Sequence, residues 1–360
     1  MRILHVVGAR PNFVKIAPLT REMSRHKGFF DQLLVHTGQH YDPTMSDIFF
    51  NELELPEPDI NLGVGSGSHA WQTSQVMVSF EPALLEFKPD WVCVVGDVNS
   101  TLACSLVAVK AGFKVAHVEA GLRSFDRSMP EEINRVLTDQ IAELLFTHSE
   151  DAGANLRGEG ISSEKIHFVG NIMIDTLVSL LPATNSRWIE LRDRLGLGEY
   201  ILVTLHRPSN VDNPQVLREI LIALSEISSE IPVLFPIHPR TRRQINVHGL
   251  AAELGSVGII EPIGYLDFLA LQAHARLVLT DSGGVQEETT YLGVPCLTAR
   301  ANTERPVTIT EGTNQLVASN AKALIKAMRS RLEEGTLEKR VPSLWDGHTA
   351  ERIVRIIRSF

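Results

Sequence analysis

Short apolar runs rich in β-branched residues alternate with longer helical patterns from one end of the chain to the other. This alternation limits the fold most, because strands separated by helices form parallel sheets with crossover helices. The expected strands of the first half are Ile3–Val7, Gln32–His36, Trp91–Val95, Lys114–Val118, Leu144–Phe146 and Ile166–Val169. Those of the second half are Tyr200–Leu205, Val233–Ile237, Gly258–Glu261 and Arg276–Thr280. The sequence therefore predicts an α/β protein.

Two such series follow one another, with the polar stretch Pro182–Arg187 between them. A chain of 360 residues is long enough for two domains. We therefore predict two Rossmann-like domains that face each other across a central cleft, over residues 1–170 and 171–348. The final helix, residues 349–360, is compatible with packing on either domain, including a return to the first.

The composition excludes several classes of protein. A formal net charge of −9 argues against a general nucleic-acid binder and against a basic membrane-surface protein. No stretch approaches the roughly 18 consecutive apolar residues of a membrane span. The cysteines, Cys93, Cys104 and Cys296, lack metal-ligand spacing and fit a reducing compartment. We expect a cytoplasmic protein without a nucleic-acid partner, a membrane partner or a bound metal.

Charged residues stand at the ends of three expected strands of the first domain. Arg10 follows the first strand, with Lys15 one turn into the next helix, Asp97 follows the third strand, and Glu119 closes the fourth. Because α/β folds bind ligands at the carboxyl edge of the sheet, these charges are expected to converge there. An N-cap role is the alternative for Asp97. The pattern predicts a site that handles protons and anions.

The segment HVEAGLRSFDRSMPEEINR, residues 117–135, concentrates carboxylates and guanidiniums after an apolar strand. Glu131, Glu132 and Arg135 open the helical pattern that follows the strand. Glu131 and Glu132 also fit the role of acidic residues in the first turn of a helix, whereas Glu119 does not. The sequence pattern leaves both roles open for Glu131 and Glu132.

Other polar and glycine-rich features carry less information. The run Gly63-Val64-Gly65-Ser66-Gly67 does not follow a clear strand, which favours a loop over a nucleotide fingerprint. Gln39 and His40 suit a loop contact and a ligand contact equally. The pattern GxxxxGK followed by Ser or Thr does not occur in the sequence, which argues against P-loop ATP chemistry.

The segment DSGGVQEE in the second half follows an expected strand and opens a helix. Gly283 and Gly284 let the backbone approach a ligand and point N–H groups at an anion, and Ser282 adds a hydroxyl. Beside a diphosphate, a carboxylate such as Glu288 would bind a ribose diol, although acids in a first helical turn also favour the helix dipole. Arg305 supplies a cation nearby. These residues predict a cradle for a nucleoside diphosphate.

Two further strands of the second domain end in histidine. His206 is followed by Arg207, and His238 precedes Pro239. A single histidine at a strand end is usually a loop anchor, but His206 is expected on the same cleft as Ser282. It is therefore a candidate for contact with a leaving phosphate. For His238, the sequence does not decide between a loop anchor and a contact with phosphate.

In this order and spacing, the motifs resemble the non-hydrolysing UDP-N-acetylglucosamine 2-epimerases. They run through essentially the whole chain as GARPNFVK, GDVNST, HVEAGLRS, MPEEINR, HR, DSGGVQEE and TERP. The resemblance implies a glycosyltransferase-B-like fold and a homodimer. It also implies interconversion of UDP-N-acetylglucosamine and UDP-N-acetylmannosamine through UDP elimination and re-addition, without an added cofactor.

The resemblance also assigns roles. The implied catalytic residues are Asp97, Glu119, Glu131 and His206, and Glu132 is then interpreted as a helix-start acid. The implied binding residues are Arg10, Lys15, Arg135, Ser282, Gly283, Gly284, Glu288 and Arg305. Pro208 after HR and Val307 after TERP depart from the common family pattern. The alternatives are the same chemistry on a UDP-diacetamido-uronate, a hydrolysing epimerase that releases UDP and free N-acetylmannosamine, and a glycosyltransferase on the same scaffold.

Overall fold

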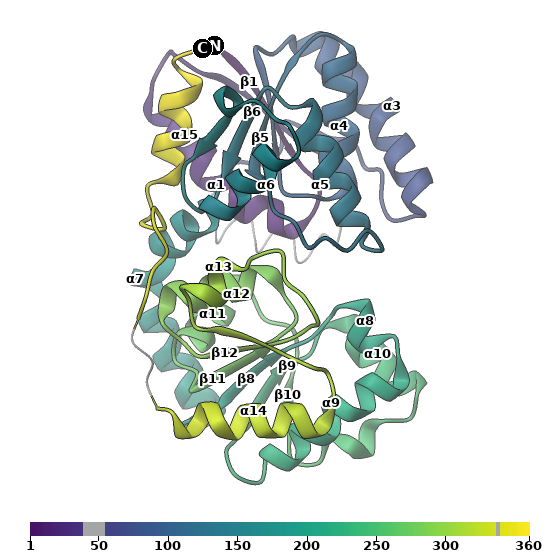
Figure 1. The fold of residues 1–360 in the computed structure, drawn as a ribbon, viewed down its shortest axis with the longest axis vertical. Helices are drawn as coiled ribbons and strands as arrows, with labels where there is room; N and C mark the ends of the chain where they lie inside the picture. The colour runs from purple at the N-terminus through teal and green to yellow at the C-terminus, as the bar shows by residue number, and fades with distance from the viewer. Residues whose placement is uncertain (39–54, 336–338) are drawn as a thin grey trace. The chain divides into compact units, whose positions relative to one another are not determined.

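The computed structural model of the chain describes residues 1–38, 55–335 and 339–360 (Figure 1). Gln39 and His40 lie outside the described residues, and so does the side chain of Arg10. The chain divides into two compact units. The first consists of Met1–Ser179 and Ser343–Phe360, and the second is Leu180–Pro342.

The first unit contains a parallel sheet of seven described strands in the order β3-β2-β1-β4-β5-β6-β7. The strands are β1 (Arg2–Val7), β2 (Asp31–His36), β3 (Ile60–Asn61), β4 (Trp91–Val95), β5 (Lys114–Ala120), β6 (Leu144–Thr147) and β7 (Ile166–Phe168). Val92 and Val94 of β4 are fully buried, as expected for a sheet covered on both faces. The strand order reverses between β1 and β4, so their carboxyl ends form the edge where such sheets bind ligands.

Helices cover this first sheet. They are α1 (Arg10–Arg25), α3 (His69–Phe87), α4 (Asn99–Lys110), α5 (Pro130–Ile141), α6 (Glu150–Gly158), the start of α7 (Ile172–Leu195) and α15 (Thr349–Ile357). Helices α1 and α5 have proline in their first turn, where the missing N–H removes no hydrogen bond. Helix α1 begins just after the end of β1, which places its first residues at the carboxyl edge of the sheet, whereas a loop separates α5 from the end of β5.

The second unit repeats this plan with six described strands in the order β10-β9-β8-β11-β12-β13. The strands are β8 (Ile201–Thr204), β9 (Val233–Pro236), β10 (Gly258–Ile260), β11 (Leu277–Thr280), β12 (Cys296–Ala299) and β13 (Asn314–Val317). The helices are α8 (Pro208–Val211), α9 (Pro214–Ile227), α10 (Pro239–Val247), α11 (Tyr265–Ala273), α12 (Gly283–Leu292), α13 (Val307–Thr310) and α14 (Ala321–Glu333). Here the order reverses between β8 and β11, whose carboxyl ends form the corresponding edge.

The predicted α/β fold with two parallel sheets is confirmed, but three strands were not predicted. They are β3, β12 and β13. Strand β5 also continues past the expected end at Val118 to Ala120. The polar stretch Pro182–Arg187 does not interrupt the elements, because it lies inside α7. Most of its side chains are exposed, so a polar sequence suits the outer face of a helix.

The C-terminal helix α15 packs on α1 of the first unit (Figure 1). Its buried face includes Ile353, Val354 and Ile357. Asp175 of α7 fixes its start, since the carboxylate accepts hydrogen bonds from Thr349 N at 3.1 Å and Ala350 N at 2.7 Å. These contacts hold the end of the chain on the first sheet.

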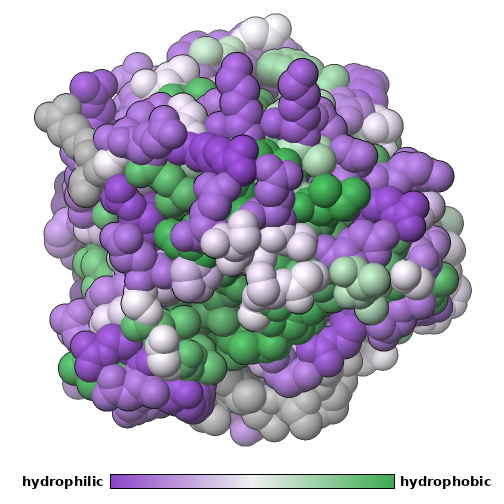
Figure 2. Space-filling view, turned by 90° about the horizontal axis from the view of Figure 1, so that it is seen from below, coloured by the Kyte–Doolittle hydropathy of each residue, from purple (hydrophilic) through white to green (hydrophobic). Residues whose placement is uncertain are grey.

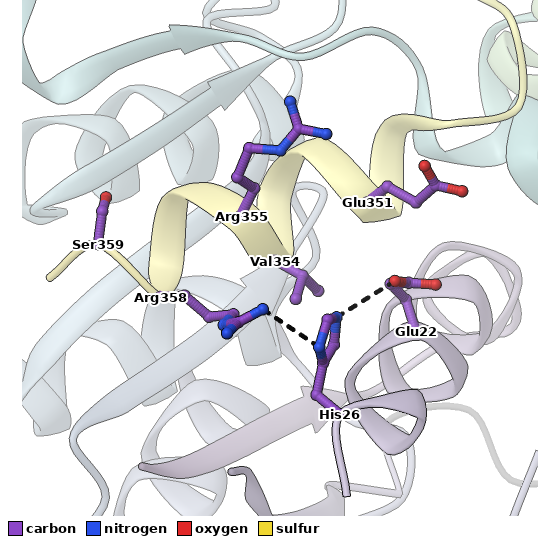
Figure 3. A pocket seen from close by; sticks show the side chains of 7 residues that line it. All are labelled: Glu22, His26, Glu351, Val354, Arg355, Arg358 and Ser359. Atoms are coloured by element: carbon purple, nitrogen blue, oxygen red, sulfur yellow. Dashed lines mark hydrogen bonds and ion pairs between the residues drawn. The ribbon is translucent and has the colours of Figure 1, made fainter.

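Helices α1 and α15 also border a surface groove of about 350 Å³ (Figure 3). Within it, Arg358 Nη1 lies 3.2 Å from His26 Nδ1, and His26 Nε2 lies 3.4 Å from Glu22 Oε1. The groove contains none of the predicted site residues. It reflects the packing of the two helices.

Within the described residues, none of the helices combines the length and the hydrophobicity needed to span a bilayer. Figure 2 shows the face seen from below, where hydrophilic residues predominate and hydrophobic atoms gather across the centre.

Asp175→Ala tests the docking of α15. The substitution leaves two buried N–H groups without an acceptor, which costs on the order of 1–3 kcal/mol for each group. We expect faster hydrogen exchange over Thr349–Ile357, measured by mass spectrometry. Glu351→Ala, at an exposed carboxyl of the same helix, should leave the exchange nearly unchanged. Equal protection in the two variants would contradict the anchoring role of Asp175.

Candidate active site

Glu119 occupies an unusual backbone position at the end of β5. Its φ is 72°, in the left-handed region, and the register with β6 shifts between Val118 and Ala120. Such a bulge inserts one residue and redirects its side chain, and bulges are common beside active sites. A non-glycine residue in this region costs of order 1–3 kcal/mol, so its surroundings must hold it in place.

The carboxylate of Glu119 forms a buried ion pair with Lys15 of α1. The two side chains are only 4% and 6% exposed, and each charge compensates the burial of the other. Gly96 lies against this pair. A Cβ atom at Gly96 would lie 3.1 Å from Lys15 Nζ and 3.3 Å from Glu119 Oε2. The ends of β4 and β5 and the first turns of α1 therefore meet at one point.

Asp97, directly after Gly96, is held by a second cation. Its Oδ2 lies 2.5 Å from Arg135 Nη2, and Arg135 is buried. The N-cap of α4 is Val98, without a side-chain cap, so the N-cap alternative for Asp97 is wrong. Asp97 instead follows β4 by two residues and lies beside a guanidinium from α5.

Glu132 is more than the helix-start acid that the sequence predicted. It is 2% exposed, and Arg135 Nη1 donates to its Oε2 at 2.5 Å. Its carboxylate also accepts hydrogen bonds from the backbone N–H groups of Ser124 and Phe125, each at 2.9 Å. Glu132 therefore fixes both the loop after β5 and the guanidinium that holds Asp97. Its neighbour Glu131 is exposed, and within the described residues its carboxylate forms no ion pair.

The predicted diphosphate cradle lies at the N-terminus of α12 in the second unit. Gly283 and Gly284 begin the helix, and Ser282 is its N-cap, with no side-chain cap. The first-turn N–H groups of such a helix attract anions. A Cβ atom at Gly283 would lie 2.5 Å from Arg305 Nη1, so glycine is required for the guanidinium to approach the helix start.

A cluster of buried charges supports this helix start. Glu304 lies 2.7 Å from Arg300, 2.5 Å from Arg305 and 3.4 Å from Arg207. Burial alone would raise the pKa of Glu304, but the guanidiniums hold it well below its usual value. Arg305 Nε also lies 2.9 Å from Glu287. Glu304 thus gathers three guanidiniums near the start of α12, and guanidinium groups are suited to binding phosphate.

Glu288 lies in a less polar environment. Tyr265 of α11 donates a hydrogen bond to its Oε1 at 2.7 Å, and burial raises the pKa of the carboxyl to about 7. Because α12 begins at Gly283, Glu287 and Glu288 stand in its second turn. The alternative interpretation of these two residues as first-turn acids is therefore wrong.

His206 lies at the carboxyl edge of the second sheet, at the end of β8. Its Nδ1 is 3.1 Å from Oδ1 of Asp281, which follows β11 and is fully buried. Burial opposes ionisation of Asp281, but hydrogen bonds from His206, Arg207 and Asn210 outweigh it and lower the pKa. An ionised carboxylate only accepts hydrogen bonds, so Nδ1 must donate and Nε2 is left for a ligand. His238 instead caps α10, with Nδ1 accepting from Arg240 N at 3.2 Å.

The structure brings two sets of predicted residues together. In the first unit Lys15 joins Glu119 and Arg135 joins Asp97. In the second unit Arg305 lies against Gly283. Roles for Asp281, Glu304 and Tyr265 were not predicted from the sequence, and Glu132 was predicted only as a helix-start acid. A strand-end position was the only sequence signal for Asp281. Among the described residues, no cluster of three or more His, Cys, Asp or Glu is arranged to hold a metal ion.

Comparison with known proteins identifies the family. The sequence profile of the UDP-N-acetylglucosamine 2-epimerases matches residues 21–358, which is most of the chain. The chain belongs to the UDP-N-acetylglucosamine 2-epimerase family. A UDP-N-acetylglucosamine 2-epimerase of Methanocaldococcus jannaschii is 46% identical over 99% of both chains. A UDP-2,3-diacetamido-2,3-dideoxy-D-glucuronate 2-epimerase of Pseudomonas aeruginosa is 42% identical over 92% of both.

A solved structure supports the same assignment. The crystal structure of Methanocaldococcus jannaschii UDP-GlcNAc 2-epimerase in complex with UDP-GlcNAc and UDP matches all of both chains, with a TM-score of 0.93 and 44% identity. The predicted glycosyltransferase-B-like α/β fold is confirmed, and so is the predicted enzyme class of nucleotide-sugar epimerase.

Glu288→Gln tests the effect of burial on this carboxyl. A pKa raised from 4.5 to about 7 means that the folded state binds the proton more tightly than the unfolded chain. The stability from the protonated form is present below pH 4.5 and lost as the pH rises through about 7. The unfolding free energy of the variant minus that of the wild type should therefore increase as the pH rises from about 5 to about 8. The expected increase is on the order of 3 kcal/mol.

Denaturant unfolding at the two pH values measures this difference. Glu311→Gln, at an exposed carboxyl of the same unit, is the control and should show no gain. A pH-independent difference between the wild type and Glu288→Gln would contradict the raised pKa.

Proposed function

We propose that this epimerase interconverts UDP-N-acetylglucosamine and UDP-N-acetylmannosamine by eliminating UDP and adding it back. The observation that carries the proposal is the pair of strand-end carboxylates Asp97 and Glu119, each in contact with a buried cation. Inversion at C2 requires groups that remove a proton from one face and deliver it to the other. Carboxylates held in place at one sheet edge supply such groups.

Similar proteins support UDP-N-acetylglucosamine as the proposed substrate. The Methanocaldococcus jannaschii structure contains UDP-GlcNAc and UDP, and the chain aligns with it over its full length. A second candidate is a UDP-diacetamido-uronate, since the relative named for that substrate is 42% identical to the chain. The two candidates share the UDP group and the chemistry at C2, and they differ in the substituents at C3 and C5.

In the first step of the proposed reaction, the bond between the anomeric C1 and the UDP oxygen breaks. The electron pair leaves with UDP, and positive charge develops at C1. Ser282, the first-turn N–H groups at Gly283 and Gly284, and Arg305 would hold the diphosphate, because these donors surround the start of α12. Glu288 would accept hydrogen bonds from the ribose hydroxyls.

His206 is assigned to the departing phosphate. Asp281 fixes its ring through Nδ1, so Nε2 is the nitrogen that would meet a phosphate oxygen. Arg10, Lys15 and Arg135 complete the proposed set of cations near the sugar and the phosphate. Lys15 and Arg135 would also hold the two carboxylates in place, because each contacts one of them.

In the second step, a carboxylate removes the C2 proton and the C–H electron pair forms the C1–C2 double bond of a glycal. Asp97, Glu119 and Glu131 are the proposed proton-transfer groups. An acid then protonates C2 from the opposite face, and UDP adds back to C1. Atoms and charge balance over the cycle and no oxidation state changes overall, so no redox cofactor is required.

The proposal assigns different tasks to the two parts of the chain. The N-terminal domain carries the proton-transfer groups, and the C-terminal domain binds UDP. Three free, buried cysteines, Cys93, Cys104 and Cys296, suit the reducing cytoplasm. The product, an activated amino sugar, suits a polymerising pathway such as polysaccharide biosynthesis.

A homodimer is also part of the proposal. Helix α3 exposes Trp71, Val78 and Leu85, which are seven residues apart and share one face of the helix. Ile133 and Leu137 of α5 are exposed as well. Helix α4 packs between α3 and α5 (Figure 1). Exposed apolar side chains gathered on neighbouring helices are typical of a protein interface, here with a second copy of the chain.

Incubation with UDP-N-acetylglucosamine in D₂O tests the reaction. We expect deuterium at C2 and a mixture of the two UDP sugars, both followed by NMR. Free sugar without retained UDP-sugar would indicate a hydrolysing epimerase. Transfer only after addition of an acceptor would indicate a glycosyltransferase. Deuterium incorporation at C2 of a UDP-diacetamido-uronate, but not of UDP-N-acetylglucosamine, would identify the former as the substrate.

Glu119→Gln separates catalysis from binding. The amide keeps the shape of the side chain but cannot accept the C2 proton, so exchange should fall by about 100-fold or more. Affinity for UDP, measured by calorimetry, should stay within a factor of two or so, because the proposed UDP cradle is in the second unit. Loss of UDP affinity with little change in exchange would assign Glu119 to binding instead.

Val78→Glu tests the dimer. A charge on this exposed face of α3 should produce monomers by disfavouring burial of the surface, as measured by light scattering. Val247→Glu, at a similarly exposed valine of α10 in the second unit, is the matched control and should remain dimeric. A monomeric wild type, or a dimeric Val78→Glu variant, would count against this interface.

A further inference from the structure

His117 is a buried, polar residue of the candidate site to which the proposed reaction gives no role. It lies on β5, two residues before Glu119, and has no exposed surface. Its Nε2 lies 2.7 Å from the carbonyl oxygen of Gly96, and its Nδ1 lies 2.7 Å from Asp139 Oδ1. A carbonyl oxygen and a carboxylate oxygen both accept hydrogen bonds, so both ring nitrogens must donate.

The charge of a doubly protonated ring is compensated locally. Asp139 of α5 is buried, and its second oxygen lies 2.7 Å from Arg123 Nη1. Arg123 in turn forms a bidentate pair with Glu159, with both contacts at 2.7 Å. Two cations, His117 and Arg123, therefore face two carboxylates. Complete pairing of this kind is what makes buried charges tolerable.

Two of these four groups, His117 and Asp139, also hold the backbone at both strand ends. Gly96, whose carbonyl accepts from His117, directly precedes Asp97. Gly121, whose N–H donates to Asp139 Oδ2 at 3.1 Å, follows Glu119 by two residues. Both glycines have positive φ, 67° and 80°, and glycine imposes little conformational preference of its own. The backbone around the two acids is therefore fixed by these hydrogen bonds.

We infer that His117 and Asp139 are positioning residues for the two strand-end acids. The imidazole, donating from both nitrogens, joins the turn before Asp97 to the helix residue that holds the turn after Glu119. This arrangement also supports Glu119 in its left-handed conformation. We call the hydrogen-bonded pair of His117 and Asp139, with its bonds to Gly96 and Gly121, the clamp. The assignment of Asp97 and Glu119 as the reacting acids rests on the proposed function, whereas the clamp rests on these hydrogen bonds.

A second histidine in the same sheet provides a control. His5 of β1 is also fully buried, but its Nε2 contacts the side chain of Gln32 at 3.0 Å. Burial lowers the pKa of His5 to about 4, which keeps the ring neutral. His5 is thus a core histidine without a contact to either strand end. A general effect of replacing a buried histidine should appear equally at both positions.

Two substitutions separate the hydrogen bonds of His117. The amide nitrogen of His117→Gln can reach the place of Nε2 and keep the bond to Gly96. That of His117→Asn lies nearer the place of Nδ1 and loses the bond to Gly96. We expect kcat for C2 exchange to fall by about 100-fold in His117→Asn, since misplacement by about 1 Å has an effect of that size. His117→Gln should retain more activity, and KM and UDP affinity should change little in both.

His5→Gln should reduce stability without reducing kcat. An unchanged kcat in folded His117→Asn would overturn the inference. Equal losses of kcat in His117→Asn, His117→Gln and His5→Gln, together with lost UDP affinity, would also overturn it, because they would indicate a general structural defect.

A spectroscopic measurement tests the clamp independently of activity. In ¹⁵N-labelled wild type at neutral pH, both ring nitrogens of His117 should carry a proton, and His5 should show a neutral ring. A neutral ring at His117 would contradict the clamp. If the wild type catalyses no C2 exchange, the proposed function fails, and the NMR result still decides the role of His117 in holding the turn.

Discussion

The buried ion pair between Lys15 and Glu119 is the interaction on which the first unit's site depends. A carboxylate that is only 4% exposed requires a partner, and a lysine from α1 supplies it. That contact needs Glu119 to leave the regular pleat of β5, which explains the bulge and the left-handed backbone. It also needs Gly96, since a side chain there would approach both charged groups. Asp97 then follows at the adjacent strand end.

The second unit has a similar fold but a different set of charged groups at the edge of its sheet. Its sheet edge gathers the guanidinium groups of Arg207, Arg300 and Arg305 around Glu304. The open start of α12 adds N–H donors, and Gly283 lets Arg305 approach them. Positive charge that is fixed before a ligand arrives suits a diphosphate. Two units of similar topology thus differ in the charged residues at their strand ends.

Sequence patterns predicted most strands, and they predicted that Asp97, Glu119 and Gly283 stand at sheet edges. They did not show the bulge at Glu119, because a single inserted residue leaves no mark on the periodicity of the strand. In the sequence, nothing distinguishes Glu132 and Asp139 from ordinary acidic residues of a helix. Their burial depends on the loop after β5 folding over α5, which is a tertiary effect. The strands Cys296–Ala299 and Asn314–Val317 were missed because four-residue runs of mixed polarity give a weak signal.

The central claim is that the bond between C1 and UDP breaks while UDP stays in its cradle. Positional isotope exchange tests it most directly, with ¹⁸O placed in the oxygen that bridges C1 and the β-phosphorus. If the bond breaks, rotation of the β-phosphate moves the label into a non-bridging position of the recovered UDP-sugar. The account predicts that this scrambling accompanies epimerisation. Epimerisation at C2 with the label still entirely in the bridge would contradict it.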